Sequence, residues 1–358
     1  MRTRAVVVGA GAVTPLGLGA IETGFVYRTG AAAMTTAPLL DANEQPITFC
    51  SISTLDPLSV GHLRAVEMAI PAMEEALQPI AHWAPQLRVR MLLSIDPHLA
   101  EQTTGEAGAW GAAPPSHAAE LVNALSQRAL EIAPSTEIAL CARGGGGPGW
   151  VLDEHLDALD VGDIDVLLFG GVHTDYDPFV IRRLEAEGRL YSSENLDALI
   201  PGESAAFVTL MRADIARRGN LRVWCRLHAV GSGWEEATPG NDHSAFEAKG
   251  LTAALRMALD ETMDEKLKVG WTITDLTFEM RRVYEWESIL VRMRDALGDP
   301  WAMDSPAQRI GHLGAAALPL SAVLAAVAYA RGYAPSKLAL AMAGSDGGER
   351  GAIVLGEP

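Results

Sequence analysis

Two successive series of apolar strands and amphipathic helices run through this chain of 358 residues. The first series contains five short runs with the composition of buried strands: RAVVV, LRVRMLLSI, TEIALCA, IDVLLFGG and ESAAFVTLMR. The second contains LRVWCRLHAVGSGW, ITDLTFEM, KLALAMAG and GAIVLG. Patterns with helical spacing, such as SHAAELVNALSQRALEIA and SAFEAKGLTAALRMALDE, separate these runs. The alternation predicts a layered α/β fold with two halves, residues 1–218 and 219–358, although they share no repeat at the level of residues.

The charge balance restricts the partners that we expect. The chain has 45 acidic and 28 basic side chains, which give a formal net charge of -17. This charge repels nucleic-acid phosphates and anionic membrane surfaces, so we expect neither as a partner. The longest apolar stretch, GAAALPLSAVLAAVAYA, is rich in alanine and contains Pro319, which favours a buried core helix over a membrane span. The opening residues do not have the pattern of a signal peptide.

The chain has three cysteines, Cys50, Cys141 and Cys225, without the paired spacing of metal ligands. A sparse, odd set is typical of a reducing compartment, and we expect a cytoplasmic protein. Cys141 stands out because it ends an apolar run and precedes four glycines in IALCARGGGGPGW. It could be the nucleophile of an acyl-transfer enzyme or a small apolar side chain buried in a sheet, and we favour the second interpretation.

Two glycine-rich segments could bind a phosphate group. VVVGAGAVTPLG follows an expected strand that stops at Gly9 and contains G-x-G, but Thr14 replaces the third glycine of a dinucleotide fingerprint. No acidic residue ends a second strand about 20 residues later, so we favour a tight turn under a sheet and expect no cofactor. ARGGGGPG could hold an anion through backbone amides and Arg143, but it lacks the Lys-Ser/Thr ending of a phosphate-binding loop. We expect it to provide flexibility.

Five segments occur in an order that resembles the β-ketoacyl synthases of the thiolase superfamily: VVVGAGAVTPLG, IDVLLFGG, IPGESAAFVTL, GHLGAAA and GSDGGERGAIVL. The resemblance spans nearly the whole chain. A Gly-Gly-Val turn followed by LEAEGRL and PGE is similar to a divergent bacterial group within these proteins. The resemblance implies a thiolase fold of five layers, αβαβα, built from two pseudo-duplicated halves. It also implies an acyl-thioester site between the halves, and a homodimer or a heterodimer with another ketosynthase-like chain through a strand at residues 138–142.

The resemblance further implies a cysteine at a strand-to-helix elbow, two histidines and a supporting lysine. Counting from the flanking strands puts the nucleophile at Ala142 or Gly145 rather than at Cys141. His312, in IGHLGAAA, matches one family histidine, while Ala307 stands where the lysine is expected.

The segment that should carry the other histidine, DLTFEMRRVYEWES, has none. It carries charged residues instead: Glu279, Arg281, Arg282, Glu285 and Glu287. These residues form either a charged site or a solvated helix start with internal ion pairs. The aromatic gate of the family's last glycine-rich turn is also missing, because Ser345 and Asp346 precede the glycines there.

These departures bear on catalysis. Claisen condensation needs a thiolate and groups that stabilise an enolate or oxyanion, and losing members of such a unit costs several orders of magnitude in rate. We therefore expect a ketosynthase-like protein that has lost standard condensing activity and acts by binding or dimerisation. The alternative is an acyltransferase or thioester hydrolase acting on acyl-CoA or acyl-carrier substrates. Cys141 would then act with His312, or His312 would act with Glu279 and Glu287 to activate water.

Overall fold

The computed structural model describes residues 3–100, 117–239, 241, 245–263 and 268–358. In the described chain, ten strands pair in the order β10-β9-β11-β12-β8-β1-β7-β6-β4-β5. The strands of the first half are β1 (Ala5–Val13), β4 (Val89–Ser94), β5 (Glu137–Cys141), β6 (Val166–Thr174) and β7 (Glu203–Met211). Those of the second half are β8 (Cys225–Trp234), β9 (Val269–Thr274), β10 (Leu297–Asp304), β11 (Leu338–Gly344) and β12 (Glu349–Gly356). β2 (Thr35–Leu40) and β3 (Pro46–Phe49) form a separate hairpin.

The two groups of five strands meet along one short edge. β1 pairs with β8 only through three antiparallel partners, from Ala5↔Leu227 to Val7↔Cys225. Within each group the pairing is mixed: β4 is parallel to β5 and β6, and β9 is parallel to β10 and β11, while the other neighbours are antiparallel. The short contact lets the two groups stack as separate layers.

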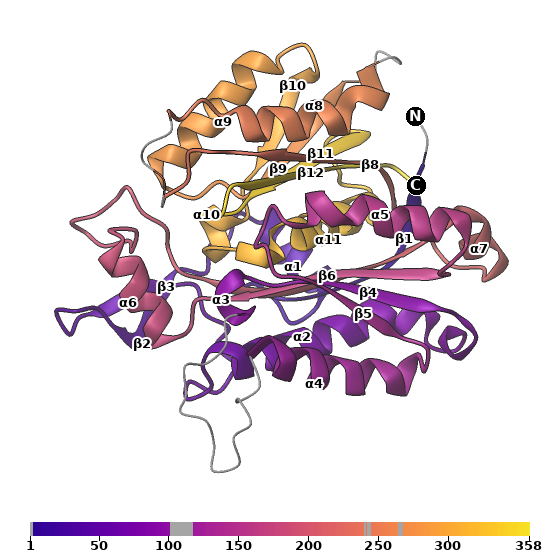
Figure 1. Cartoon of the computed structure of the whole chain (residues 1–358), viewed down its shortest axis with the longest axis horizontal. Helices are drawn as coiled ribbons and strands as arrows, with labels where there is room; N and C mark the ends of the chain where they lie inside the picture. Colours follow the sequence, from indigo (N-terminus) through magenta and orange to yellow (C-terminus); the bar gives the residue numbers. More distant parts are fainter. Residues whose placement is uncertain (1–2, 101–116, 240, 242–244, 264–267) are drawn as a thin grey trace.

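Helices fill the spaces inside and outside these layers. They are α1 (Ala20–Arg28), α2 (Gly61–Leu77), α3 (Pro97–Ala100), α4 (His117–Ile132), α5 (Pro148–Val161), α6 (Pro178–Ala186), α7 (Ala213–Arg218), α8 (Lys249–Met263), α9 (Met280–Arg292), α10 (Ala307–Ile310) and α11 (Ala317–Ala330). Figure 1 shows α2 and α4 on one outer face, α5 and α11 between the two strand layers, and α8 and α9 on the other outer face. The five-layered αβαβα architecture expected from the sequence is confirmed. The boundary at residues 218 and 219 falls between α7 and β8 and stays a prediction.

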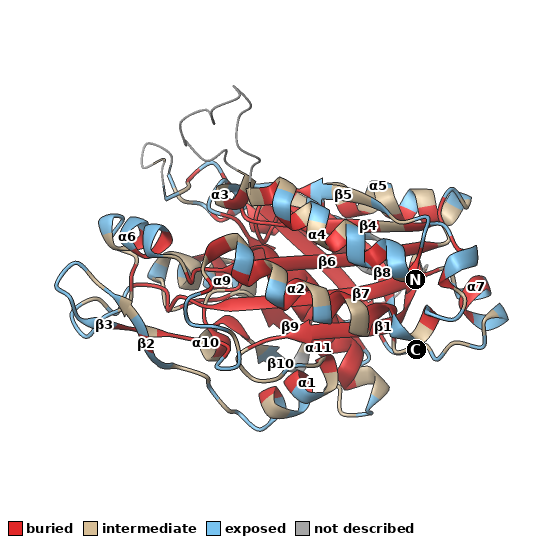
Figure 2. Cartoon of the chain, turned by 90° about the horizontal axis from the view of Figure 1, so that it is seen from below, coloured by how far each residue is buried: buried red, intermediate tan, exposed pale blue. Residues whose placement is uncertain are grey.

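An apolar helix, α11, occupies the centre of the molecule. Residues Ala317–Ala328 of α11 are all buried, and α11 contacts strands of both halves. A helix that is apolar around its whole circumference must be buried on all sides. The prediction that this segment forms a core helix is therefore confirmed. Figure 2 shows β1, β4, β6 and β7 as a continuous buried region, with exposed residues on outer helices such as α4 and α6. Among the described helices, none combines the length and the apolar character needed to cross a membrane.

The glycines of the opening segment have a different role from the one predicted. β1 continues through Gly9 to Val13 instead of turning there. A Cβ atom on Gly9 would lie 2.2 Å from Ala76 O, and one on Gly11 would lie 2.0 Å from Ala72 O. These glycines therefore let the backbone of α2 lie directly on β1, and the prediction of a tight turn was wrong. Because α2 covers this backbone, the segment does not offer its amides to a pyrophosphate.

The second glycine-rich segment also serves close packing. A Cβ on Gly146 would lie 2.3 Å from Glu349 O, and one on Gly149 would lie 2.5 Å from Gly351 Cα. The start of α5 thus lies against the backbone of β12, which joins the first half to the second. Ser345 fixes the turn further, because its hydroxyl accepts a hydrogen bond from Gly146 N (2.9 Å) and donates one to Arg143 O (2.5 Å). The expectation of flexibility was wrong, because these contacts hold the segment in place.

Candidate functional site

A cavity of about 500 Å³ lies where the two halves meet. The first half contributes residues that follow β4 and end β6, together with the turn before α5. The second half contributes the segments after α10 and β11. The polar and glycine residues of its wall that are discussed below are Asp96, Gly144, Gly145, His173, Asp175, Arg189, Arg282, His312, Ser345 and Asp346. β4 and β6 are parallel, so their carboxyl ends meet at one edge of the sheet, where α/β proteins commonly place their sites.

Four of these residues, Asp96, His173, Asp175 and His312, are linked side chain to side chain, and we call them the tetrad. His173 Nδ1 lies 2.6 Å from Asp96 Oδ2, in a hydrogen bond. His173 Nε2 lies 3.0 Å from Asp175 Oδ2, in an ion pair that is not aligned as a hydrogen bond. His312 Nδ1 lies 3.1 Å from the same Asp175 oxygen. The two imidazole rings meet edge to face, with centroids 4.5 Å apart.

The inner part of the tetrad is shielded from solvent. The side chains of His173 and Asp175 are 1% and 3% exposed, whereas that of His312 is 24% exposed. Burial lowers the pKa of His173, but the carboxylates of Asp175 and Asp96 outweigh burial and raise it to about 10. Burial would raise the pKa of both carboxyls, but the charge of His173 holds them below their usual range. In the protein alone, an imidazolium therefore lies between two carboxylates.

Local backbone structure presents His312 to the cavity. Gly311 has φ +79°, a conformation that favours glycine, and a Cβ there would lie 2.7 Å from Pro201 O. The next residue donates a hydrogen bond from His312 N to Ile200 O (2.8 Å). The PGE segment and the GHLGAAA segment thus hold each other in place. The structure puts His312 in the cavity wall, while its chemical role stays a prediction.

Cys141 has a different environment. It ends β5, is 3% exposed and belongs to the apolar core between the two strand layers. Burial raises the pKa of its thiol to about 11. Cys141 is not among the described residues that line the cavity, whereas Gly144 and Gly145 are. Cys50 and Cys225 are also buried, and burial raises the pKa of both thiols.

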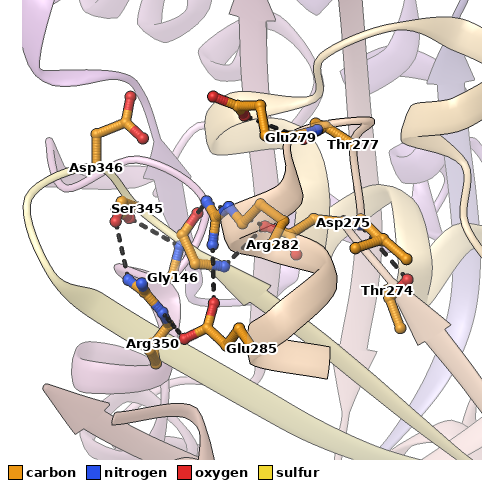
Figure 3. Close-up of polar contacts among 12 residues, drawn as sticks. Gly146, Thr274, Asp275, Thr277, Glu279, Arg282, Glu285, Ser345, Asp346 and Arg350 are labelled. Carbon is orange, nitrogen blue, oxygen red and sulfur yellow. Dashed lines mark hydrogen bonds and ion pairs between the residues drawn. The ribbon is translucent and has the colours of Figure 1, made fainter. Parts of the chain in front are cut away.

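The segment that lacks the second family histidine forms an arginine and carboxylate network. Figure 3 shows Arg282 beside Asp275 and Glu285, with Arg350 on the other side of Glu285. Arg282 donates to Gly344 O (2.8 Å) and lies 3.4 Å from Glu285 and 3.7 Å from Asp275. Arg350 pairs with Glu285 at 2.7 Å. Each of these buried charges has a partner of opposite sign, as buried ions require.

The two predicted glutamates differ in position. Glu279 pairs with Arg189 (2.7 Å), which also contacts Asp346 (2.7 Å) in the cavity wall. Glu287 lies on the exposed face of α9, outside the set of described residues that line the cavity. The structure therefore gives Glu279 an arginine partner near the cavity, and it leaves Glu287 away from the cavity. Cooperation of either glutamate with His312 stays a prediction.

Sequence reasoning missed Asp96, His173 and Asp175. The signal was present in SIDPH and GGVHTDYD, where polar residues directly follow or end buried strands. Side chains at the carboxyl ends of neighbouring parallel strands lie close together, so both segments could have been identified as one site.

Comparisons with known proteins place this site in a known fold. No protein-family model matches the chain, and no curated protein matches its sequence. A chain of AntDE:AntF, described as a type II PKS acyl-carrier protein in complex with its ketosynthase bound to the hexaketide, is similar with a TM-score of 0.79 and 15% identity. The ishigamide ketosynthase/chain length factor has a TM-score of 0.79 and 18% identity. A β-ketoacyl synthase from Burkholderia phymatum STM815 has a TM-score of 0.76 and 15% identity.

Each of these three comparisons covers 100% of this chain and 100% of the other. The similarity therefore extends through both halves and includes the segments that form the cavity. The chain has the thiolase fold of the β-ketoacyl synthases, as the order of its sequence motifs implied.

Proposed function

We propose that this chain is a ketosynthase-like protein that does not condense acyl thioesters through a covalent acyl-cysteine and acts by binding, as part of a dimer. The observation that carries this proposal is the elbow between β5 and α5. There Gly144 and Gly145 line the cavity, while Cys141 lies in the core. We also propose a cytoplasmic location, because three unpaired cysteines suit a reducing compartment.

The elbow is shaped for glycine. Gly144 has φ +66°, and a Cβ there would lie 3.0 Å from Ser345 Oγ. A Cβ on Gly145 would lie 2.7 Å from Gly314 O, a backbone atom that can yield only if the segment moves. A cysteine at either position would strain the turn, which supports a binding role for the cavity. Its volume of about 500 Å³ suits a small-molecule ligand, and we propose an acyl thioester.

We expect incubation with acetyl-CoA or malonyl-CoA to leave the intact mass of the protein unchanged. A rise in the thiol pKa from 9.0 to about 11 lowers the thiolate fraction of Cys141 at neutral pH by about 100-fold, and the core also blocks access. The unfolded chain, in which all three cysteines should react with iodoacetamide, is the positive control. A stoichiometric acyl adduct that disappears in Cys141→Ala would refute the proposal.

The alternative function is acyl-thioester hydrolysis, favoured by the position of His312 in the cavity wall beside Asp175. The same incubation separates the two functions when the released CoA thiol is also measured. Catalytic release without an adduct, lost in His312→Ala, would establish a hydrolase. Release of CoA no faster than in buffer without protein supports the proposal that the chain acts by binding.

The edge strand β5 is the surface that we propose for dimerisation. β5 ends the strand order, so one side of its backbone has no neighbouring strand among the described residues. Leu140 on this strand is 44% exposed. An open edge with an apolar side chain favours pairing with another chain. The partner is a second copy or a related ketosynthase-like chain, as in the ketosynthase/chain length factor to which this chain is similar.

We expect Leu140→Asp to convert a homodimer to a monomer, because pairing of β5 with a second chain would bury the charge of the new aspartate. Size-exclusion chromatography with light scattering measures the change. Val291→Asp is the matched control, since Val291 is 80% exposed on the outer helix α9. A wild-type chain that is monomeric alone and stays so with a ketosynthase-like partner would refute the interface.

A further inference from the structure

We propose that His173, Asp175 and His312 form a binding site for a divalent transition-metal ion of the zinc type at the base of the cavity. One ligand atom from each residue can be chosen so that all three lie within 4.8 Å of one another. The site goes beyond the proposed function, because it does not depend on whether the cavity binds an acyl thioester.

Two of the three spacings between the ligand atoms are close to those around a single ion. His173 Nε2 and His312 Nδ1 lie 3.0 and 3.1 Å from Asp175 Oδ2. Ligand atoms about 2.0–2.2 Å from a tetrahedral Zn²⁺ are about 3.3–3.6 Å apart. Each histidine nitrogen would therefore need to move only a few tenths of an ångström farther from the Asp175 oxygen to share an ion with it.

A second observation points to a ligand at this position. His173 Nε2 is fully buried, and its contact with Asp175 Oδ2 at 3.0 Å is not aligned as a hydrogen bond. A buried ring nitrogen without an aligned hydrogen-bond partner has a lone-pair position that a ligand can use when the imidazole is neutral. Its ring is held by Asp96, which lies 2.6 Å from Nδ1 and also accepts a hydrogen bond from Ala315 N (3.1 Å). A carboxylate on the other nitrogen is the usual support of a metal-bound histidine, because it fixes the tautomer that leaves Nε2 free.

Charge and exposure agree with this assignment. The carboxylates of Asp96 and Asp175 together balance the charge of one divalent ion when both imidazoles are neutral. Two imidazoles and one carboxylate favour zinc, cobalt or iron over calcium or magnesium, which prefer oxygen ligands. His312 is the most exposed of the three ligands, so the open coordination positions face the cavity. Three protein ligands with an open position are typical of an ion that contacts a substrate.

The test uses the full chain after treatment with a chelator. Isothermal titration with Zn²⁺ should show one ion per chain, with a Kd in the micromolar range or below. Co²⁺ should give the visible absorption bands of a four- or five-coordinate ion with nitrogen ligands. We expect His312→Ala and Asp175→Asn to weaken Zn²⁺ binding by more than about 100-fold, and Asp96→Asn by about 10–100-fold. Circular dichroism checks that each variant folds.

His117→Ala is the matched control. His62 and His117 stack with centroids 4.3 Å apart, and His62 pairs with Glu120, so the two histidines form a second pair that could hold an adventitious ion. Binding that survives His117→Ala and is lost in folded His312→Ala supports the tetrad site. Three results would overturn it: no Zn²⁺ binding to the wild type, binding unchanged in His312→Ala, or binding lost in His117→Ala. None of these results depends on acyl-thioester binding.

Discussion

Removing either member of the buried Arg64–Glu203 pair should lower the free energy of unfolding by about 3–5 kcal/mol. The Arg64 guanidinium contacts both Glu203 oxygens, with Nε at 2.5 Å and Nη2 at 2.8 Å, and the two side chains are 2% and 0% exposed. Such bidentate pairs are strong, and each ion depends on the other because water is excluded. Glu203 also accepts hydrogen bonds from Ile52 N (2.6 Å) and Thr174 Oγ1 (3.2 Å). Arg64 further lies over the Tyr176 ring at 4.0 Å.

Denaturant unfolding of Arg64→Met, Glu203→Leu and the double variant measures this effect. Each single variant leaves an uncompensated buried charge. The double variant leaves none, so we expect it to be less destabilised than the sum of the two. Asp214→Asn, which disrupts the exposed contacts with Arg212 and Arg218, should change stability by less than about 1 kcal/mol. Strict additivity, or single variants as mild as this control, would contradict the prediction.

We expect Gly11→Ala to destabilise the chain by an amount at the upper end of the roughly 1–3 kcal/mol typical of overpacking. The new methyl group would lie 2.0 Å from Ala72 O and 2.8 Å from Ala76 N, both backbone atoms of α2. A helix backbone cannot rotate away, so α2 would have to move off β1.

Gly270→Ala is the matched control on a strand. Its Cβ would meet only the Ser336 side chain, with Oγ at 2.5 Å and Cβ at 2.8 Å. The hydroxyl group can change rotamer, and Ser336 lies in a loop rather than in a helix, so its backbone needs to shift by only a few tenths of an ångström. We expect the denaturant midpoint of this variant to fall by clearly less than that of Gly11→Ala. Equal shifts for the two variants would show that loss of glycine flexibility, rather than contact with α2, determines the effect.

The strands buried on both faces could be predicted best. β4, β6, β7, β11 and β12 lie between helices or in the central layers, so their sequences are continuous apolar runs that local patterns detect. The order of the family motifs then predicted how these strands and helices are arranged in five layers. By contrast, β2 and β3 lie in residues 34–58, a segment that no pattern placed. Alternation of buried and exposed residues in these two short strands is too brief to distinguish them from a loop.

Errors arose where a distant element determines the conformation. Gly9 and Gly11 have the local signature of a turn, but the approach of α2 is what requires them. The tetrad was missed for the same reason. His312 was recognised because it lies in a motif, whereas Asp96 and His173 are 77 positions apart in sequence and meet only when β4 and β6 pair. Cys141 was considered as a nucleophile because of the glycines after it, and those glycines pack against β12.

Helix α11 has a consequence for how the molecule unfolds. It contacts β1, β6 and β7 on one side and β11 and β12 on the other. Neither half can separate from the other without exposing the apolar surface of this helix to water, which is unfavourable. The two halves should therefore lose their structure together, as one cooperative unit, and the amide hydrogens of α11 should exchange with solvent only when the whole chain opens.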